Sequence, residues 1–222
     1  MILRSELDRL LAASSIFSVV LVLLRIIHLH KFMFVWMIWN LFLAYIPYVI
    51  STALSIRVAR PRRSRRSDRL LFLSLFLSWL LFIPNTFYIL TDLYHLIDCR
   101  DPRIPEWYDL ALIFSFAWNG LLLGVLSVRQ MEKLLLPITG TFFGNVFIYL
   151  VMALNALGVY TGRYLRFNSW DILTNPFELA GNILDLVVHP FQSHQAWGMI
   201  ACYTILLSFI YNMLKKISHA LT

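Results

Sequence analysis

The chain has 222 residues, of which 59% are hydrophobic and 14% are charged. Soluble domains are nearer half apolar and about a quarter charged, so this composition excludes a soluble domain and predicts an integral membrane protein. The net charge of +7 does not indicate nucleic-acid binding, because seven arginines lie close together, from Arg57 to Arg69, between two apolar segments. Such a position is typical of a loop that sets membrane topology or contacts anionic lipids.

Six apolar segments are long enough to cross a membrane as helices, for which roughly 20 residues are needed. We therefore expect an all-α membrane protein, with residues 1–222 forming a single membrane domain. Lysines and arginines are concentrated at both chain ends and in the loops on the same side, which places both termini in the cytoplasm and the protein in the cytoplasmic membrane. The predicted transmembrane helices cover residues 10–27, 32–56, 70–96, 108–128, 134–158 and 196–214.

Residues 175–188, between the fifth and sixth spans, predict a shorter amphipathic helix. Asn175 is placed to be its N-cap, Pro176 its first helical residue and Glu178 the acidic partner of a capping box. Apolar residues share the face opposite Glu178, so we expect this helix to lie on the outer membrane surface.

The third predicted span carries a polar stripe. Asn85, Tyr88, Asp92 and His95 fall on one face at 100° per residue. An ionisable residue within a span is costly and by default faces a cavity or a partner, so Asp92 is the strongest candidate for a functional residue. The alternatives for Asp92 are an ion pair with an outer arginine, or a surface position beyond the end of the span. Asp92 and His95 would suit two metal ligands or a base with its orienting acid, and the presence of a metal stays open.

Other spans place polar side chains in their outer halves, where they are expected to meet this stripe. They are Asn40 in the second span and Tyr108, Asp109 and Asn119 in the fourth. The alternative for the asparagines is hydrogen bonding between helices. The alternative for Asp109 is a favourable position in the first turn of its helix.

The segment after the fifth span, residues 162–171, is rich in polar and aromatic side chains. Arg163 and Arg166 are spaced to present two guanidinium groups to a phosphate or carboxylate, including that of a lipid headgroup. Alternatively, one of them neutralises Asp92 or Asp171, and the aromatic residues form a belt at the membrane surface.

These patterns predict an outward-facing polar pocket that binds an anionic lipid-like or small envelope ligand. The alternatives are a membrane-embedded hydrolase or transferase, a small-solute transporter, and a structural or assembly protein. The sequence identifies no cofactor and no partner beyond the lipid bilayer. The candidate catalytic residues are Asp92, His95 and Asp109, and the candidate ligand-binding residues are Asn40, Asn85, Tyr88, Tyr108, Asn119, Arg163, Arg166, Asn168, Trp170 and Asp171.

Four segments together resemble the bacterial membrane family called domain of unknown function 1361. They run from Trp39 to Pro47, from Leu81 to Leu93, from Trp107 to Asp109 and from Gly162 to Asp171. Position 45 is tyrosine where the family is expected to favour tryptophan. The resemblance implies a bacterial protein with several membrane spans, and it implies no particular reaction.

Overall fold

The computed structural model describes residues 2–58, 66–98, 101–167 and 171–220, and all regular elements within these ranges are helical. Six of the described helices are long and apolar enough to cross a membrane. The chain is therefore an all-α, multi-pass membrane protein, as its composition predicts. The six candidate spans are Glu6–Leu29, Val35–Val58, Asp68–Tyr94, Glu106–Pro137, Gly140–Arg163 and His194–Ser218.

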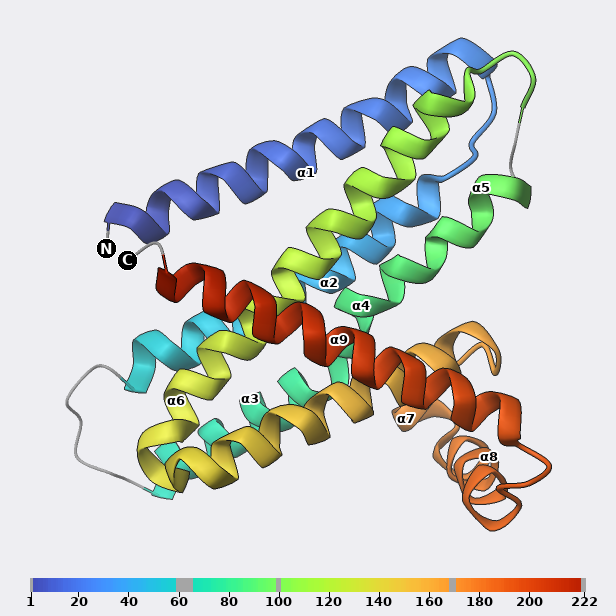
Figure 1. Cartoon of the computed structure of the whole chain (residues 1–222). Coiled ribbons are helices and arrows are strands. Elements are labelled where there is room, and N and C mark those ends of the chain that lie inside the picture. Colours follow the sequence, from blue (N-terminus) through green and yellow to red (C-terminus); the bar gives the residue numbers. More distant parts are fainter. Residues whose placement is uncertain (1, 59–65, 99–100, 168–170, 221–222) are drawn as a thin grey trace.

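Figure 1 shows both ends of the chain on the same side of the bundle, as an even number of crossings requires. The fourth and fifth spans form one element, α6, which bends at Gly140 with φ 75° and ψ 172°, a conformation open to glycine. The elements are α1 (Ile2–Leu29), α2 (Val35–Val58), α3 (Arg66–Phe82), α4 (Pro84–Tyr88), the 3₁₀ helix η1 (Ile89–Tyr94), α5 (His95–Asp98), α6 (Glu106–Arg163), α7 (Asp171–Thr174), α8 (Pro176–Val188) and α9 (His194–Ala220).

The third span is not one continuous α-helix. It breaks between α3 and α4 because Pro84 has no backbone N–H, and beyond α4 it narrows to the 3₁₀ helix η1. Carbonyl groups left without a helical donor are costly inside a membrane. The Asn85 side chain compensates at the break, since its Nδ2 donates to the Phe82 carbonyl (3.0 Å), while the Ile83 carbonyl accepts from both the N–H (3.1 Å) and the Oγ1 (2.7 Å) of Thr86.

The first half of α6 holds this broken span through two glycines spaced four residues apart. A Cβ atom on Gly120 would lie 2.6 Å from the Thr86 carbonyl oxygen, and one on Gly124 would lie 2.5 Å from Thr86 Oγ1. Both distances are too short for any side chain, so the close approach of α4 to α6 requires glycine here. This spacing is characteristic of helices that pack closely in membranes.

The second half of α6 repeats the arrangement on another side of α4. A Cβ on Gly158 would lie 2.5 Å from Pro84 Cβ, and one on Gly162 would lie 3.1 Å from the Tyr88 ring. The short helix α4 is thus held between both halves of α6, and this packing fixes the direction in which Tyr88 points.

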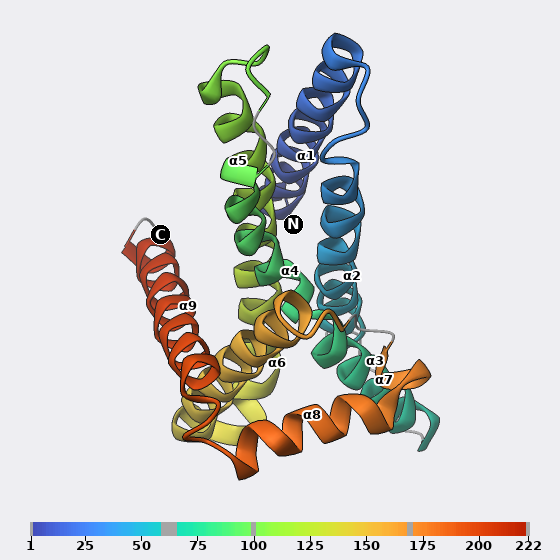
Figure 2. The same cartoon turned by 90° about the vertical axis from the view of Figure 1, so that its right-hand side faces the viewer.

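Helix α8 lies across the direction of the long helices. It is seen nearly end-on in Figure 1 and lengthwise in Figure 2, whereas α9 runs lengthwise in Figure 1. Asn175 precedes the helix and Pro176 is its first residue, as predicted, but the Asn175 side chain makes no capping hydrogen bond. The expectation of a capping box is therefore wrong, because the backbone of Asn175 (φ −134°, ψ 53°) lies outside the extended region usual for an N-cap.

Candidate functional site

A polar pocket of about 420 Å³ lies where the second half of α6 ends beside the third span. We call it the arginine pocket. It is lined by Tyr88, His95, Gly162, Arg163 and Arg166. All of them except Gly162 are among the predicted site residues. The structure brings Tyr88 and His95 together with residues that follow them by 60 to 80 positions in the chain.

The C-terminus of α6 sets the position of Arg166. The N–H of Phe167 donates to the Thr161 carbonyl (3.2 Å), and Arg166 has φ 59°. This hydrogen bond spans one residue more than that of a Schellman motif, and glycine adopts a positive φ far more readily than arginine does. An arginine in this conformation is strained, and such strain is commonly found at functional sites. The turn directs Arg166 to the arginine pocket and Phe167 to the neighbouring cavity.

Arg163 is fixed by its neighbours on the third span. Its Nη1 lies 2.9 Å from His95 Nε2, and its guanidinium carbon lies 5.4 Å from the centre of the Tyr94 ring. Because arginine only donates, Nε2 of His95 accepts this hydrogen bond and the imidazole proton resides on Nδ1. The ring of His95 also packs edge-on against Trp36 of α2, with 5.5 Å between the ring centres. The guanidinium is thereby held in place beside the pocket.

Asp92 lies behind these residues and is 1% exposed. Its Oδ2 accepts a hydrogen bond from Asn40 Nδ2 (3.1 Å), which links α2 to η1. This carboxylate interacts electrostatically with the positive charge of Arg163. The structure therefore places Asn40, Asp92, His95 and Arg163 in one polar group where α2, the third span and α6 meet.

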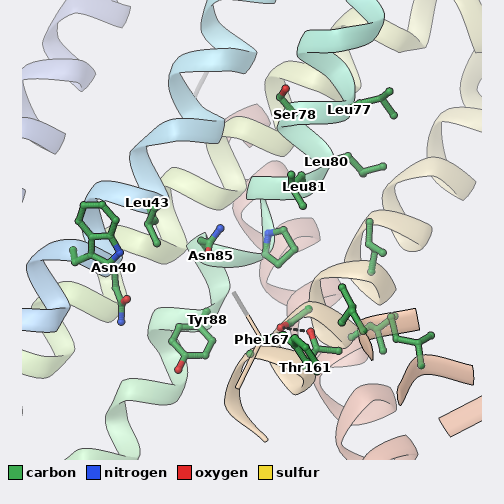
Figure 3. A pocket seen from close by; sticks show the side chains of 18 residues that line it. Asn40, Leu43, Leu77, Ser78, Leu80, Leu81, Asn85, Tyr88, Thr161 and Phe167 are labelled. Atoms are coloured by element: carbon green, nitrogen blue, oxygen red, sulfur yellow. Dashed lines mark hydrogen bonds between the residues drawn. The ribbon is translucent and has the colours of Figure 1, made fainter. Parts of the chain in front are cut away.

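A second cavity, of about 810 Å³, adjoins the arginine pocket, and the two share Tyr88 and Gly162 as lining residues. We call it the apolar cavity. Figure 3 shows Asn40, Asn85 and Tyr88 at its polar end, with leucines of α3 farther along its wall. Most of the wall is aliphatic, with Leu77, Leu80 and Leu81 from α3, Leu154 and Leu157 from α6, and Leu179 and Ile183 from α8.

Asp109 lies elsewhere, at the contact of α1 with α6. Its carboxylate accepts hydrogen bonds from Arg25 Nε (2.7 Å) and Arg25 Nη2 (3.0 Å). The Arg25 side chain is fully buried, and its guanidinium carbon lies 4.6 Å from the centre of the Phe34 ring. The structure thus gives Asp109 an arginine partner that the sequence reasoning did not assign.

Tyr108 and Asn119 also face α1. The Tyr108 hydroxyl donates to the Leu21 carbonyl (2.7 Å), and Asn119 Nδ2 donates to Ser18 Oγ (3.1 Å). Ser15 Oγ donates to Asn119 Oδ1 at 3.4 Å. The bonds of Asn119 are hydrogen bonds between helices, the alternative given for the asparagines. Neither Tyr108 nor Asn119 lines the two described cavities.

The remaining predicted residues are less informative. Asp171 begins α7, where its Oδ1 accepts a hydrogen bond from Thr174 Oγ1 (3.1 Å). Asn168 and Trp170 lie outside the described residues. Within the described part of the chain, no group of three or more His, Cys, Asp or Glu side chains is arranged to hold a metal ion.

Sequence reasoning missed the glycine pairs of α6 and the contribution of α8 to the cavity wall. The spacing Gly120-x-x-x-Gly124, repeated by Gly158-x-x-x-Gly162, is a known signal for close helix packing and was available in the sequence. The cavity itself had no such signal, since its leucines are common in any span.

These features define a polytopic α-helical membrane protein in which a polar pocket adjoins an apolar cavity. The family model described as "Protein of unknown function (DUF1361)" matches residues 39–210, and the chain belongs to this family. This confirms the resemblance seen in the sequence. Comparisons with curated proteins and with solved structures found no match.

Proposed function

We propose that the protein binds an anionic amphiphile, with the charged head in the arginine pocket and the apolar part in the apolar cavity. The observation that carries this proposal is the junction of the two cavities, because Tyr88 and Gly162 line both. A ligand with a charged end and an apolar end would fill the arginine pocket and the apolar cavity at once.

The arginine pocket supports an anionic head. Arg163 and Arg166 supply two permanent positive charges, and guanidinium groups bind phosphate and carboxylate through paired hydrogen bonds. The hydrogen bond to His95 holds the Arg163 guanidinium in place before a ligand arrives. Such preorganisation reduces the entropy lost on binding.

The apolar cavity supports an apolar chain rather than a small hydrophilic anion. Its volume of about 810 Å³ falls in the range of roughly 300–1,000 Å³ that ligand pockets commonly have. A small anion would occupy the arginine pocket and leave the aliphatic walls without contact, whereas an alkyl chain would gain the transfer free energy of burial.

The charge distribution supports an outward-facing pocket. The arginine pocket lies at the end of the third span that is opposite the arginine-rich loop after α2. Positive charge in short loops favours the cytoplasm, so we propose that both termini lie on the cytoplasmic side of the cytoplasmic membrane and that the pocket opens on its outer side.

Native mass spectrometry of the purified protein would test the proposal. We expect a defined anionic amphiphile to co-purify with the wild type and to be lost from Arg163→Ala/Arg166→Ala. Arg103→Ala is the matched control, because it removes an arginine that binds Asp101 and does not line the described cavities. Identical lipid profiles in all three proteins would contradict the proposal.

A pair of serines on α3 tests the apolar part separately. Ser78 lines the apolar cavity, whereas Ser74, one turn earlier, is exposed and does not. Ser78→Phe should displace the co-purifying amphiphile by filling the cavity, and Ser74→Phe should retain it. Equal retention by both variants would show that the chain does not occupy this cavity.

A further inference from the structure

We infer that the amphiphile is a lipid of the surrounding bilayer, and that it reaches the apolar cavity sideways, through an opening between α3 and α8. This inference rests on the proposed function and specifies it, by naming the membrane as the source of the ligand. Three features of the molecule support this path: the anchoring of α8, its two apolar surfaces, and the exposed rim of α3.

Helix α8 is anchored at its C-terminal end. Trp197 Nε1 of α9 donates to the Leu186 carbonyl (2.9 Å), and Leu186 packs in a small apolar cluster with Ala156, Ala196 and Ile200. The preceding turns of α8 carry Leu179 and Ile183, which line the apolar cavity. The helix is therefore a wall of the cavity, attached firmly at one end.

The outer surface of α8 is apolar as well. Phe177 is 91% exposed, Leu184 61% and Val188 64%, while Glu178 and Asp185 lie on the remaining face. In water these side chains would form a costly apolar patch. Since α8 packs against helices of membrane length, the surface that covers it without cost is the acyl region of the bilayer.

The opposite side of the opening is formed by α3. Leu77 lines the apolar cavity and is nevertheless 54% exposed, so it stands at the rim. Leu70 (67% exposed) and Leu73 (51% exposed) continue the exposed aliphatic surface along the same helix. The lipid-facing surface of α3 is thus continuous with the interior of the cavity.

A sideways path also suits the arrangement of the ligand. A lipid in the leaflet already has its head at the membrane surface, near the depth of the arginine pocket, and its chain in the hydrocarbon. Moving between α3 and α8 exposes no part of the chain to water, and so avoids the hydration cost that a path through the aqueous phase imposes.

Substitutions at the rim test this path. The protein would be reconstituted in phosphatidylcholine nanodiscs, and the rate at which it takes up fluorescent dioleoyl phosphatidic acid from the bilayer would be measured. Leu77→Trp narrows the opening and should slow uptake about tenfold, the size expected of modest overpacking. Leu73→Trp, one turn away and similarly exposed, should leave the rate unchanged. Leu77→Ala should accelerate uptake, and this variant tests the path if Leu77→Trp fails to fold.

Binding of glycerol 3-phosphate from water provides the second arm, because this probe has the head chemistry without a chain. It should bind all three rim variants and the wild type equally, and it should not bind Arg163→Ala/Arg166→Ala. If rim substitutions leave lipid uptake unchanged while uptake still requires the arginines, the sideways path is wrong and the proposed function stands. If neither probe requires the arginines, both proposals fail.

Discussion

The buried ion pair between Arg25 and Asp109 allows a test of whether Asp109 is structural or belongs to the binding site. We predict that Asp109→Asn destabilises the protein strongly. The substitution removes a carboxylate that accepts two hydrogen bonds from a guanidinium whose side chain is 0% exposed. Breaking a buried pair in this way costs about 3–5 kcal/mol.

The paired variant Arg25→Met/Asp109→Leu should recover most of this loss. It removes both charges together, and replacing a buried ion pair by apolar residues of similar volume is often neutral or stabilising. The local surroundings favour such a replacement, because the Arg25 guanidinium already contacts the Phe34 ring and the Met33 sulfur. Thermal unfolding in detergent would compare the single variant, the double variant and the wild type.

Ligand binding in the same proteins decides the role of Asp109. Because the ion pair lies between α1 and α6 and lines neither described cavity, the double variant should retain the co-purifying amphiphile. Loss of the ligand from a stably folded double variant would refute this reasoning and return Asp109 to the site. An Asp109→Asn protein as stable as the wild type would refute the assigned energetics.

Two further predictions concern the ends of helices. Arg166→Gly should stabilise the protein by about 1 kcal/mol, since glycine adopts the positive φ of this position without strain. The same substitution should weaken the binding of glycerol 3-phosphate about tenfold, because it removes a positive charge. Arg166→Ala should lose the affinity for glycerol 3-phosphate without gaining stability. Equal unfolding temperatures for the two variants would contradict the inference that the backbone of Arg166 is strained. Hydrogen bonds from Arg103 and Lys31 hold the pKa of Asp101 well below its usual value. The hydrogen bonds of Asp101 should therefore stabilise the loop fully above about pH 4 and stabilise it less as the pH falls below that value. Amide hydrogen exchange at Ile104 would measure this loss of stability. An equal loss at low pH in Asp101→Asn would contradict the prediction.

The spans were predictable because apolar segments of membrane length have few other uses. The polar group was predictable for a related reason: charged and amide side chains are rare in spans, so Asn40 and Asp92 stood out before any contact was known, and Arg163 stood out in the polar segment expected after the fifth span. The face that Asp92 and His95 share survives the change to a 3₁₀ helix, since residues three apart also align in that geometry.

The partners of Asp109, Tyr108 and Asn119 were not predictable from spacing. Periodicity indicates which residues share a face of one helix, but it does not indicate which neighbouring helix that face meets. Arg25 lies near the end of the first predicted span, and no spacing in the sequence links it to Asp109, yet it is buried against α6. The apolar cavity was equally hidden, because it results from the break at Pro84 and from the position of α8, neither of which leaves a distinct pattern among leucines.

Asp92 can either balance charge or take part in acid–base chemistry, and Asp92→Asn separates these roles. The carboxylate is buried, accepts a hydrogen bond from Asn40 and interacts electrostatically with Arg163. It therefore offsets part of the positive charge that an anionic ligand meets. If it balances charge, Asp92→Asn should raise the affinity for glycerol 3-phosphate roughly two- to fivefold, the range of a modest charge interaction. Asn40→Ala, which removes the hydrogen bond and keeps the charge, should not raise it. An unchanged affinity in Asp92→Asn, measured by titration calorimetry, would exclude charge balance and favour the acid–base role that a residue in this position was first expected to have.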